Sequence, residues 1–178
     1  MRQGTTIWLT GLPSAGKSTL ALALARILRA GRCPVEILDG DEVRANLSPD
    51  LGYQRADRIE NVRRIGWLAQ LLARNGVAVL VPAIAPYAES RETVRKVHDA
   101  AGIPYVEVYI ATPLDVCRSR DVKGLYARQA RGEISGLTGV DDPYERPEFA
   151  DLVIDTAGVT AAQCAEDILA HLVDRGLL

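Results

Sequence analysis

The sequence predicts an α/β fold, with a mostly parallel sheet of about five strands and helices on both faces. Short β-prone runs alternate along the chain with stretches of helical periodicity. One of these runs, residues 77–81, is apolar throughout, as expected for a strand that is covered on both faces. The chain has 178 residues, the usual size of one compact domain. We therefore expect a single domain over residues 1–178.

Local signals set the boundaries of the predicted elements. Asn75-Gly76 is typical of a left-handed helix end, and Thr112-Pro113 indicates a helix start with a capping threonine and proline at the first helical position. Strands are expected at residues 5–10, 34–38, 77–81, 105–110 and 152–154, and helices at residues 17–30, 42–47, 57–75, 89–101, 112–120 and 160–175. Within these elements, Trp8 in the first strand and Trp67 in a helix are expected to pack in the core.

Residues 121–148 interrupt this alternation. They contain several glycines, two prolines and many charges, without a sustained apolar period. A long connection of this kind inside a compact domain is typical of a functional segment that moves. We expect a mobile lid over these residues, which are called the lid segment below.

The composition excludes several classes of partner. A net charge of −2 gives no global positive field that would attract nucleic acid or an anionic membrane. The apolar runs are far shorter than the ~20 residues that a membrane-spanning helix needs. The three cysteines are widely spaced, as for small hydrophobic residues in a reducing compartment. We expect a cytoplasmic protein that binds small molecules, with no nucleic acid and no membrane as partner.

Residues 11–18, with the sequence GLPSAGKS, match the phosphate-binding loop (P loop) pattern G-x-x-x-x-G-K-[ST] in full, between a predicted strand and a predicted helix. Inward-pointing N–H groups and the helix N-terminus would bind the phosphates of ATP. Lys17 would neutralise the β- and γ-phosphates, and Ser18 would offer a hydroxyl to Mg²⁺. The predicted ATP-binding residues are Gly11, Leu12, Pro13, Ser14, Ala15, Gly16, Lys17, Ser18 and Thr19, with Arg120 beside the lid segment as a further contact.

Asp39 and Asp41 follow the second predicted strand, which we expect to lie beside the first. Their carboxylates would then face the phosphates at the P loop. One of them would hold Mg²⁺, and the other would accept the proton of an attacking hydroxyl. The alternative is a plain Asp-Gly turn, because both residue types favour turns.

Three further polar residues are candidates for binding an anionic acceptor. Arg44 follows Asp41 by three residues, and Arg58 and Asn61 share one face of a long predicted helix. The planar guanidinium group bonds two oxygens of a phosphate or sulfate at once. The alternative for each arginine is a place on a solvated charged face.

These residues together indicate a small ATP-dependent kinase that phosphorylates a small acceptor. Two other functions stay open at this point. One is a P-loop kinase for an antibiotic, a sugar acid or a nucleotide, and the other is a nucleotide-dependent regulatory protein that binds ATP and a partner.

Several motifs together resemble the adenylylsulfate kinase (APS kinase) family, over residues 5 to about 156. These kinases transfer the γ-phosphate of ATP to the 3′-hydroxyl of adenylylsulfate in sulfate assimilation. The resemblance implies a P-loop NTPase-type three-layer sandwich, Mg²⁺ as cofactor, ATP and adenylylsulfate as substrates, and a homodimer. The motifs are residues 11–18 (GLPSAGKS), 38–44 (LDGDEVR), 50–53 (DLGY), 57–66 (DRIENVRRIG), 121–126 (DVKGLY) and 138–145 (TGVDDPYE).

The resemblance also implies roles for single residues. Asp41 would orient or deprotonate the 3′-hydroxyl and act with Lys17 in catalysis. Ser18 and Asp39 are the predicted metal-binding residues, although the sequence does not show which of Asp39 and Asp41 contacts the ion directly. Tyr53 would stack on the acceptor adenine. The implied acceptor-binding residues are Asp41, Arg44, Tyr53, Arg58, Asn61, Ile84, Lys123, Gly124, Leu125 and Leu137.

Two residues depart from the family pattern. Ala85 stands where many relatives have a serine that has been proposed as a phosphorylated intermediate. Alanine has no hydroxyl, so we expect direct in-line transfer between two bound nucleotides. Leu137 stands where relatives often have a phenylalanine that completes an aromatic sandwich around the acceptor adenine, so the affinity for the acceptor is expected to differ.

Overall fold

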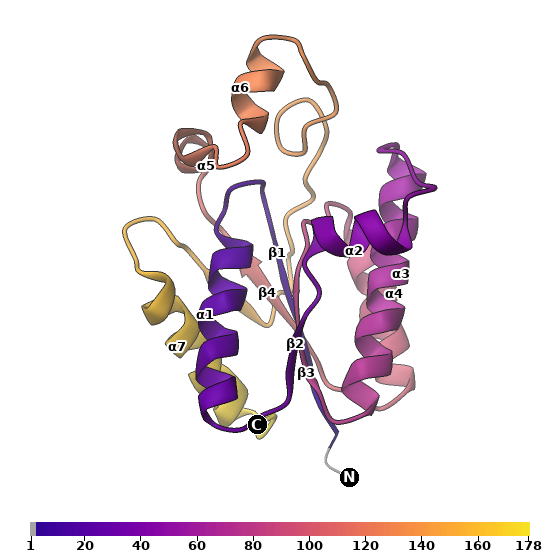
Figure 1. The fold of residues 1–178 in the computed structure, drawn as a ribbon, viewed down its shortest axis with the longest axis vertical. Coiled ribbons are helices and arrows are strands. Elements are labelled where there is room, and N and C mark those ends of the chain that lie inside the picture. The colour runs from indigo at the N-terminus through magenta and orange to yellow at the C-terminus, as the bar shows by residue number, and fades with distance from the viewer. Residues whose placement is uncertain (1–2) are drawn as a thin grey trace.

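The computed structural model describes residues 3–178, and it contains a sheet flanked by helices on both faces (Figure 1). Residues 1–2 of the predicted domain lie outside the described residues. The strands are β1 (Thr6–Gly11), β2 (Val35–Ile37), β3 (Ala78–Pro82), β4 (Tyr105–Ile110) and β5 (Leu152–Ile154). The helices are α1 (Lys17–Ala30), α2 (Gly40–Leu47), α3 (Arg55–Arg74), α4 (Ala88–Ala100), α5 (Leu114–Arg120), α6 (Leu125–Ala130) and α7 (Ala161–Asp174).

The sheet has five strands in the order β2-β3-β1-β4-β5, and every pair of neighbours is parallel. This confirms the predicted α/β class. The expectation that the second strand lies beside the first was wrong, because β3 pairs with both of them. The reason is burial: β3 is buried along its whole length and suits the interior of the sheet, whereas β2 is short and partly exposed and suits an edge.

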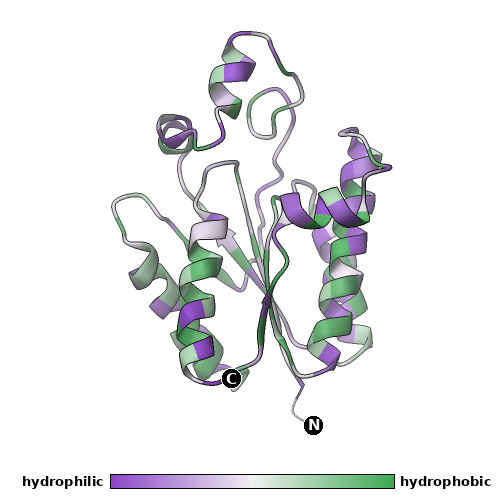
Figure 2. Ribbon diagram, in the orientation of Figure 1, coloured by the Kyte–Doolittle hydropathy of each residue, from purple (hydrophilic) through white to green (hydrophobic). Residues whose placement is uncertain are grey.

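Helices α1 and α7 cover one face of the sheet, and α3 and α4 cover the other (Figure 1). Successive side chains of a strand point to opposite faces. In β1, Ile7 and Leu9 pack in the core under α1 and α7, whereas Trp8 packs in the core under α3 and α4. Figure 2 shows the hydrophobic residues of the helices turned toward the sheet. The three layers of the predicted sandwich follow from this alternation.

The two tryptophans have different environments. Trp8 is fully buried, and its indole Nε1 donates to the main-chain oxygen of Ala83 at 3.2 Å, which confirms its predicted place in the core. Trp67 is 57% exposed, so its predicted core position was wrong. Helix α3 buries the stripe that contains Ile65 and Ala69, and position 67 lies outside that stripe.

Two local predictions also differ from the structure. Helix α5 begins at Leu114 with Pro113 as the flanking residue, and the Thr112 hydroxyl binds the main-chain oxygen of Ala15 and the hydroxyl of Thr156 instead of capping the helix. The lid segment contains α6, which the sequence analysis missed. A helix of six residues is too short for a helical period to be detected.

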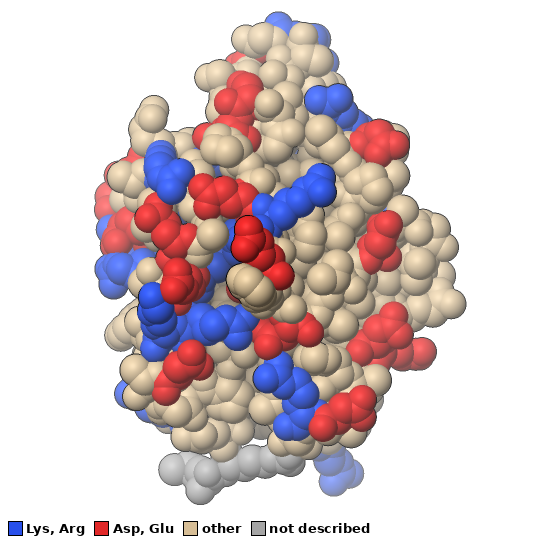
Figure 3. Space-filling view, turned by 180° about the vertical axis from the view of Figure 1, so that it is seen from behind, with Lys and Arg blue, Asp and Glu red and all other residues tan. Residues whose placement is uncertain are grey.

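The surface of the described residues carries charges of both signs. Figure 3 shows Lys and Arg side chains intermixed with Asp and Glu on the face that it presents. Nucleic-acid binding proteins concentrate basic residues on one face, so this mixed face does not have that character. None of the helices within residues 3–178 combines the length and the apolar character of a membrane span.

The packing of α3 on α4 depends on Gly66. A Cβ atom at this position would lie 2.6 Å from Cγ2 of Val94, which is closer than folded proteins allow. We expect Gly66→Ala to lower the free energy of unfolding by about 1–2 kcal/mol, because overpacking outweighs the gain in helix propensity. Urea unfolding followed by circular dichroism measures the change.

The matched control for this prediction is Gly66→Ala/Val94→Ala, which removes the methyl groups in conflict. Its loss of stability should be smaller than the sum of the two single losses, because the two positions are in contact. A Gly66→Ala protein as stable as the parent would contradict the packing described here.

Candidate active site

A cavity of about 900 Å³ opens at the carboxyl ends of the strands, beneath the lid segment. Open parallel sheets bind their ligands at this edge. Most of the predicted site residues line the cavity, namely Pro13, Ser14, Gly16, Lys17, Ser18, Thr19, Asp39, Asp41, Arg44, Tyr53, Arg58, Asn61, Ile84, Arg120, Lys123, Leu125 and Leu137. The other predicted residues, Gly11, Leu12, Ala15 and Gly124, are not part of the described lining.

The P loop connects the central strand β1 to α1. Gly16 has a φ of 103°, a left-handed conformation that glycine adopts without steric cost, and it lies at the N-terminus of α1. Lys17 donates from Nζ to the main-chain oxygens of Gly11 at 2.9 Å and Leu12 at 2.7 Å. Its ammonium group therefore lies inside the curl of the loop. Burial lowers the pKa of Lys17 to about 8.

Ser18 and Asp39 meet at the mouth of the P loop. The Ser18 hydroxyl donates to Oδ2 of Asp39 at 2.6 Å, while Oδ1 of Asp39 accepts from the main-chain N–H of Asp41 at 3.0 Å and caps α2. Asp39 reaches the loop although β2 is an edge strand, because the strand ends close to the N-terminus of α1.

These two oxygens fit a magnesium ion that is held together with phosphates. Mg²⁺ usually takes one or two protein oxygens and completes its shell with water and substrate phosphates. Within residues 3–178 there is no group of three or more His, Cys, Asp or Glu that could form a metal site from the protein alone. Ser18 and Asp39 would supply two oxygens to such an ion, and water and nucleotide phosphates would supply the others.

Asp41 lies on the first turn of α2 and forms an ion pair with Lys123 of the lid segment. Both side chains are exposed to the cavity mouth. The pair connects α2 with the lid segment across the cavity, and it brings together two residues that the sequence assigned to the same site.

Tyr53 is flanked by two guanidinium groups. The guanidinium carbon of Arg44 lies 4.4 Å from the ring centroid, and that of Arg58 lies 5.8 Å from it. Arg58 also donates to the main-chain oxygens of Tyr53 at 2.8 Å and Gly136 at 2.6 Å, and to the Thr138 hydroxyl at 3.0 Å. Tyr53 is 71% exposed as a residue, so its ring is accessible to a planar ligand.

The inner part of the cavity contains Asn61, Leu137 and the connection from β3 to α4. Oδ1 of Asn61 is buried and has no hydrogen-bond partner among the described residues. A buried polar atom without a partner is costly, and a ligand donor would remove that cost. Ile84 and Ala85 form the adjoining wall, where Ala85 has a φ of 45°.

Arg120 holds the P loop against the chain that follows β5. It donates to the hydroxyl and the main-chain oxygen of Thr156, both at 2.7 Å, and approaches the main-chain oxygen of Ala15 at 3.4 Å. The sequence analysis missed the cavity residues beyond β5, which are Thr156, Val159, Ala161 and Cys164. Thr156 follows a predicted strand almost directly, so the rule that ligands bind beyond the carboxyl ends of strands could have found it.

A sequence model of the family described as adenylylsulphate kinase matches residues 3–155 of this chain. The chain belongs to the adenylylsulphate kinase family. An adenylyl-sulfate kinase from Myxococcus xanthus is 53% identical over 175 residues, which cover 98% of this chain and 94% of the relative. The solved structure of an APS kinase from Mycobacterium tuberculosis, in complex with AMPPNP and APS, has a TM-score of 0.94 and 45% identity over 97% of this chain and 99% of that one.

The fold extends to kinases outside the adenylylsulphate kinase family. A shikimate kinase from Acinetobacter baumannii in complex with shikimate has a TM-score of 0.64 over 99% of this chain and 97% of that one, at 20% identity, which shows a common fold alone. These comparisons confirm the predicted family and the P-loop kinase fold. The roles given to single residues of the cavity stay predictions.

The lowered pKa of Lys17 predicts that this family member takes up protons when it binds ATP. Phosphate charge beside the ammonium group would raise its pKa again. At about pH 8, close to the pKa of Lys17, binding of a non-hydrolysable ATP analogue with Mg²⁺ should take up about half a proton. Calorimetry in buffers of different ionisation enthalpy measures the uptake.

The same titration at about pH 6 is the control, because Lys17 is then already charged in the free protein and the uptake should fall close to zero. Equal uptake at both pH values would show that another group binds the proton.

Proposed function

We propose that this chain is an adenylylsulfate kinase, which transfers the γ-phosphate of ATP to the 3′-hydroxyl of adenylylsulfate and releases ADP and 3′-phosphoadenylylsulfate. The observation that carries the proposal is one cavity in which a complete P loop faces Arg44, Arg58 and Tyr53. A triphosphate and a second, anionic nucleotide would meet there beside Asp41. The Mycobacterium tuberculosis relative was solved in complex with AMPPNP, an ATP analogue, and APS, which supports one nucleotide in each half of the cavity.

The P loop binds the donor in this proposal. The N-terminus of α1 and the N–H groups of residues 11–18 would bind the β- and γ-phosphates, and Lys17 would turn its ammonium group from the loop carbonyls toward them. Mg²⁺ held by Ser18 and Asp39 together with the phosphates would spread the negative charge of the transferring group. Arg120 supports the loop from behind through Ala15 and Thr156.

The arginines and Tyr53 bind the acceptor. A guanidinium group bonds two oxygens of a phosphate or sulfate at once, and Arg44 and Arg58 supply two such groups on one side of the cavity. Tyr53 offers an exposed ring on which adenine would stack. Asn61 would receive a hydrogen bond from the acceptor at its buried Oδ1.

The reaction is a single in-line displacement. The 3′-oxygen of the acceptor forms a bond to the γ-phosphorus, the bond from that phosphorus to the β–γ bridging oxygen breaks, and ADP leaves. The hydroxyl proton passes to the Asp41 carboxylate. Ala85 offers no hydroxyl that could accept the phosphoryl group first. Lys123 and Leu125 would exclude water by closing the lid segment over the cavity.

Several further features complete the proposal. A role in sulfate assimilation follows from the family. A homodimer, a cytoplasmic location and Mg²⁺ as the ion remain predictions, as does a single domain over the whole chain with a lid that moves. Two alternative functions are another small-molecule kinase and a regulatory ATP-binding protein. The first would phosphorylate a different acceptor, and the second would turn over poorly with any acceptor.

An acceptor screen tests the proposed function. Purified protein with Mg²⁺ and ATP should release ADP in a 1:1 ratio with adenylylsulfate consumed, since each in-line transfer uses one of each. Shikimate, gluconate and AMP serve as competing acceptors. Faster ADP release with one of these than with adenylylsulfate, or no turnover with adenylylsulfate by a folded protein, would overturn the assignment.

A second prediction concerns Asp41. The change Asp41→Asn removes the proton acceptor and keeps the shape of the side chain, so kcat should fall by about 10²–10⁴-fold. The affinity for ATP should stay the same, because the P loop is not altered. Steady-state kinetics and equilibrium binding of an ATP analogue measure the two quantities.

Glu42→Gln is the matched control for Asp41→Asn, because it removes a carboxylate from the next residue of α2 without touching the cavity lining. Its kcat should remain within about twofold of the parent. A comparable loss of kcat in both variants would show that kcat depends on the charge of α2 rather than on proton transfer to Asp41.

A further inference from the structure

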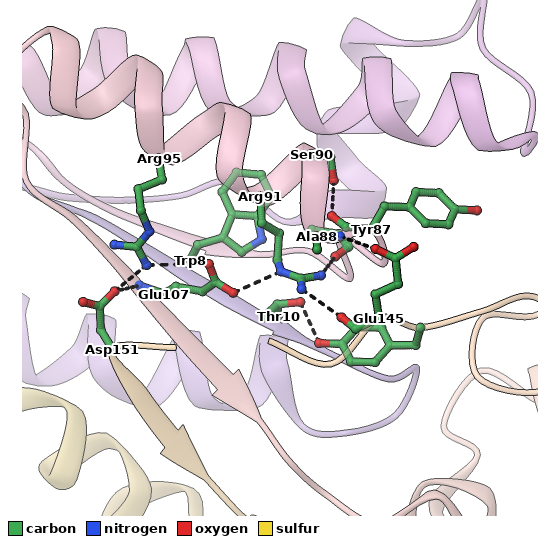
Figure 4. Close-up of polar contacts among 12 residues, drawn as sticks. Trp8, Thr10, Tyr87, Ala88, Ser90, Arg91, Arg95, Glu107, Glu145 and Asp151 are labelled. Atoms are coloured by element: carbon green, nitrogen blue, oxygen red, sulfur yellow. Dashed lines mark hydrogen bonds and ion pairs between the residues drawn. The ribbon is translucent and has the colours of Figure 1, made fainter. Parts of the chain in front are cut away.

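Arg91 is a buried arginine of α4 that the reaction described above does not use. It is 3% exposed, and its guanidinium group forms three hydrogen bonds in three directions. Nε donates to Glu107 of β4 at 3.0 Å, one terminal nitrogen donates to the main-chain oxygen of Ala85 at 2.7 Å, and the other donates to the main-chain oxygen of Glu145 at 2.8 Å. Figure 4 shows Arg91 between Glu107 and Glu145.

The bond to Ala85 fixes a wall of the cavity. Ala85 has a left-handed φ of 45°, which is unfavourable for a residue with a side chain, and it lines the cavity next to Ile84. A buried, charged donor on its main-chain oxygen offsets that cost. Arg91 therefore holds the backbone of the wall in a conformation that it would not adopt alone.

Arg91 joins the wall to the lid segment, and a second chain of hydrogen bonds joins them through Thr10 of β1. Its hydroxyl donates to the main-chain oxygen of Ile84 at 2.5 Å, so the Tyr144 hydroxyl, 2.9 Å away, must donate to the same Thr10 oxygen. Both links thus start at the wall, at Ile84 and Ala85, and end at neighbouring residues of the lid segment, Tyr144 and Glu145.

The end of the lid segment is fixed to the same place by Glu145. Its main-chain N–H donates to the oxygen of Pro86 at 2.8 Å, and its carboxylate accepts from the N–H of Ala88 at the start of α4 at 2.7 Å. Earlier in the lid segment, Thr138 accepts from Arg58. The wall, the lid segment and an acceptor-binding arginine are therefore connected through hydrogen bonds.

Glu107 keeps the guanidinium group of Arg91 in place. Glu107 is buried, and burial raises the pKa of its carboxyl group. The positive charges of the two arginines beside it lower that pKa and oppose the effect of burial. Arg95 is the second of these, 3.6 Å from Glu107 and 2.7 Å from Asp151. Within residues 3–178, Arg95 belongs to the same charged network but forms its hydrogen bond and ion pairs with Glu107 and Asp151 and not with the wall, which makes it a natural control.

We propose that Arg91 is a positioning residue for the acceptor: it sets the place of Ile84 and Ala85 relative to the end of the lid segment, and so the width of the acceptor half of the cavity. The inference rests on the proposed function, because it assigns that half to adenylylsulfate. Arg91 acts on the wall and the lid segment through the main-chain oxygens of Ala85 and Glu145, and none of its hydrogen bonds goes to the P loop.

Steady-state kinetics with both substrates tests this role. Arg91→Met should raise the KM for adenylylsulfate by about tenfold or more, while the KM for ATP stays within about twofold of the parent. A purely structural role would lower stability and the amount of active enzyme without separating the two KM values. Arg95→Met should lower the midpoint of thermal unfolding and leave both KM values within about twofold.

The double variant Arg91→Met/Glu107→Gln separates positioning from folding. Arg91→Met alone leaves the buried carboxylate without its nearest partner, which destabilises the fold, whereas the double change removes that charge as well. The double variant should regain thermal stability and still show the raised KM for adenylylsulfate. It also carries the test if Arg91→Met does not fold.

In an enzyme that uses adenylylsulfate, either of two results for the Arg91 variants would overturn the inference: an equal rise of both KM values, or a double variant whose KM for adenylylsulfate returns to that of the parent together with its stability. An Arg95→Met protein with the same selective rise would overturn it as well. If the unchanged protein does not phosphorylate adenylylsulfate, the proposed function fails, and the assignment of Arg91 to that acceptor fails with it.

Discussion

In a fully parallel sheet every strand ends at the same edge, and the site of this protein depends on that constraint. The P loop leaves β1, Asp39 and Asp41 follow β2, the wall with Ile84 follows β3, and Thr156 follows β5. Residues that are more than a hundred positions apart therefore line one cavity. The helices cover both faces of the sheet, so the cavity lies beyond the carboxyl ends of the strands and not on a face of the sheet (Figure 1).

Burying a charged side chain costs desolvation free energy, and polar groups close to each buried cation offset that cost. Lys17 is buried against the carbonyls of its own loop, and its lowered pKa is the electrostatic sign of that burial. Arg91 is buried as deeply but has a carboxylate and two main-chain oxygens as partners. In the proposed reaction Lys17 would exchange its carbonyl partners for phosphate, whereas Arg91 would keep its partners and hold the backbone. The partners of the two buried cations fit these two different proposed roles.

The lid segment is connected to the site at several points although it is irregular over most of its length. Lys123 forms an ion pair with Asp41, and Arg58 binds Gly136 and Thr138. Its end is tied to the start of α4 through Glu145. Tyr126 and Leu137 of the lid segment are also buried in the core under α1 and α7, so apolar packing holds the segment as well as polar contacts. Movement of the lid segment stays a prediction.

The sequence alone determined the fold class, the P loop and the family, because these depend on local patterns: a motif of fixed spacing between a strand and a helix, and strands that alternate with helices. It also assigned Asp41, Arg44, Arg58 and Lys123 to one site through the family resemblance, and the structure places them around one cavity. The roles of those residues are not decided by their proximity.

Only the tertiary structure decided the order of the strands, the exposure of Trp67 and the contacts of Thr112 and Arg91. Each depends on partners far away in the sequence: β3 lies between β1 and β2, Thr112 binds Ala15 and Thr156, and Arg91 joins α4 to β4 and to the lid segment. A periodic pattern shows which side of a helix is apolar, but it does not show which polar group another segment brings to it. For this reason the sequence showed Arg91 only as one charge among many on a helix, and its hydrogen bonds became visible with the fold.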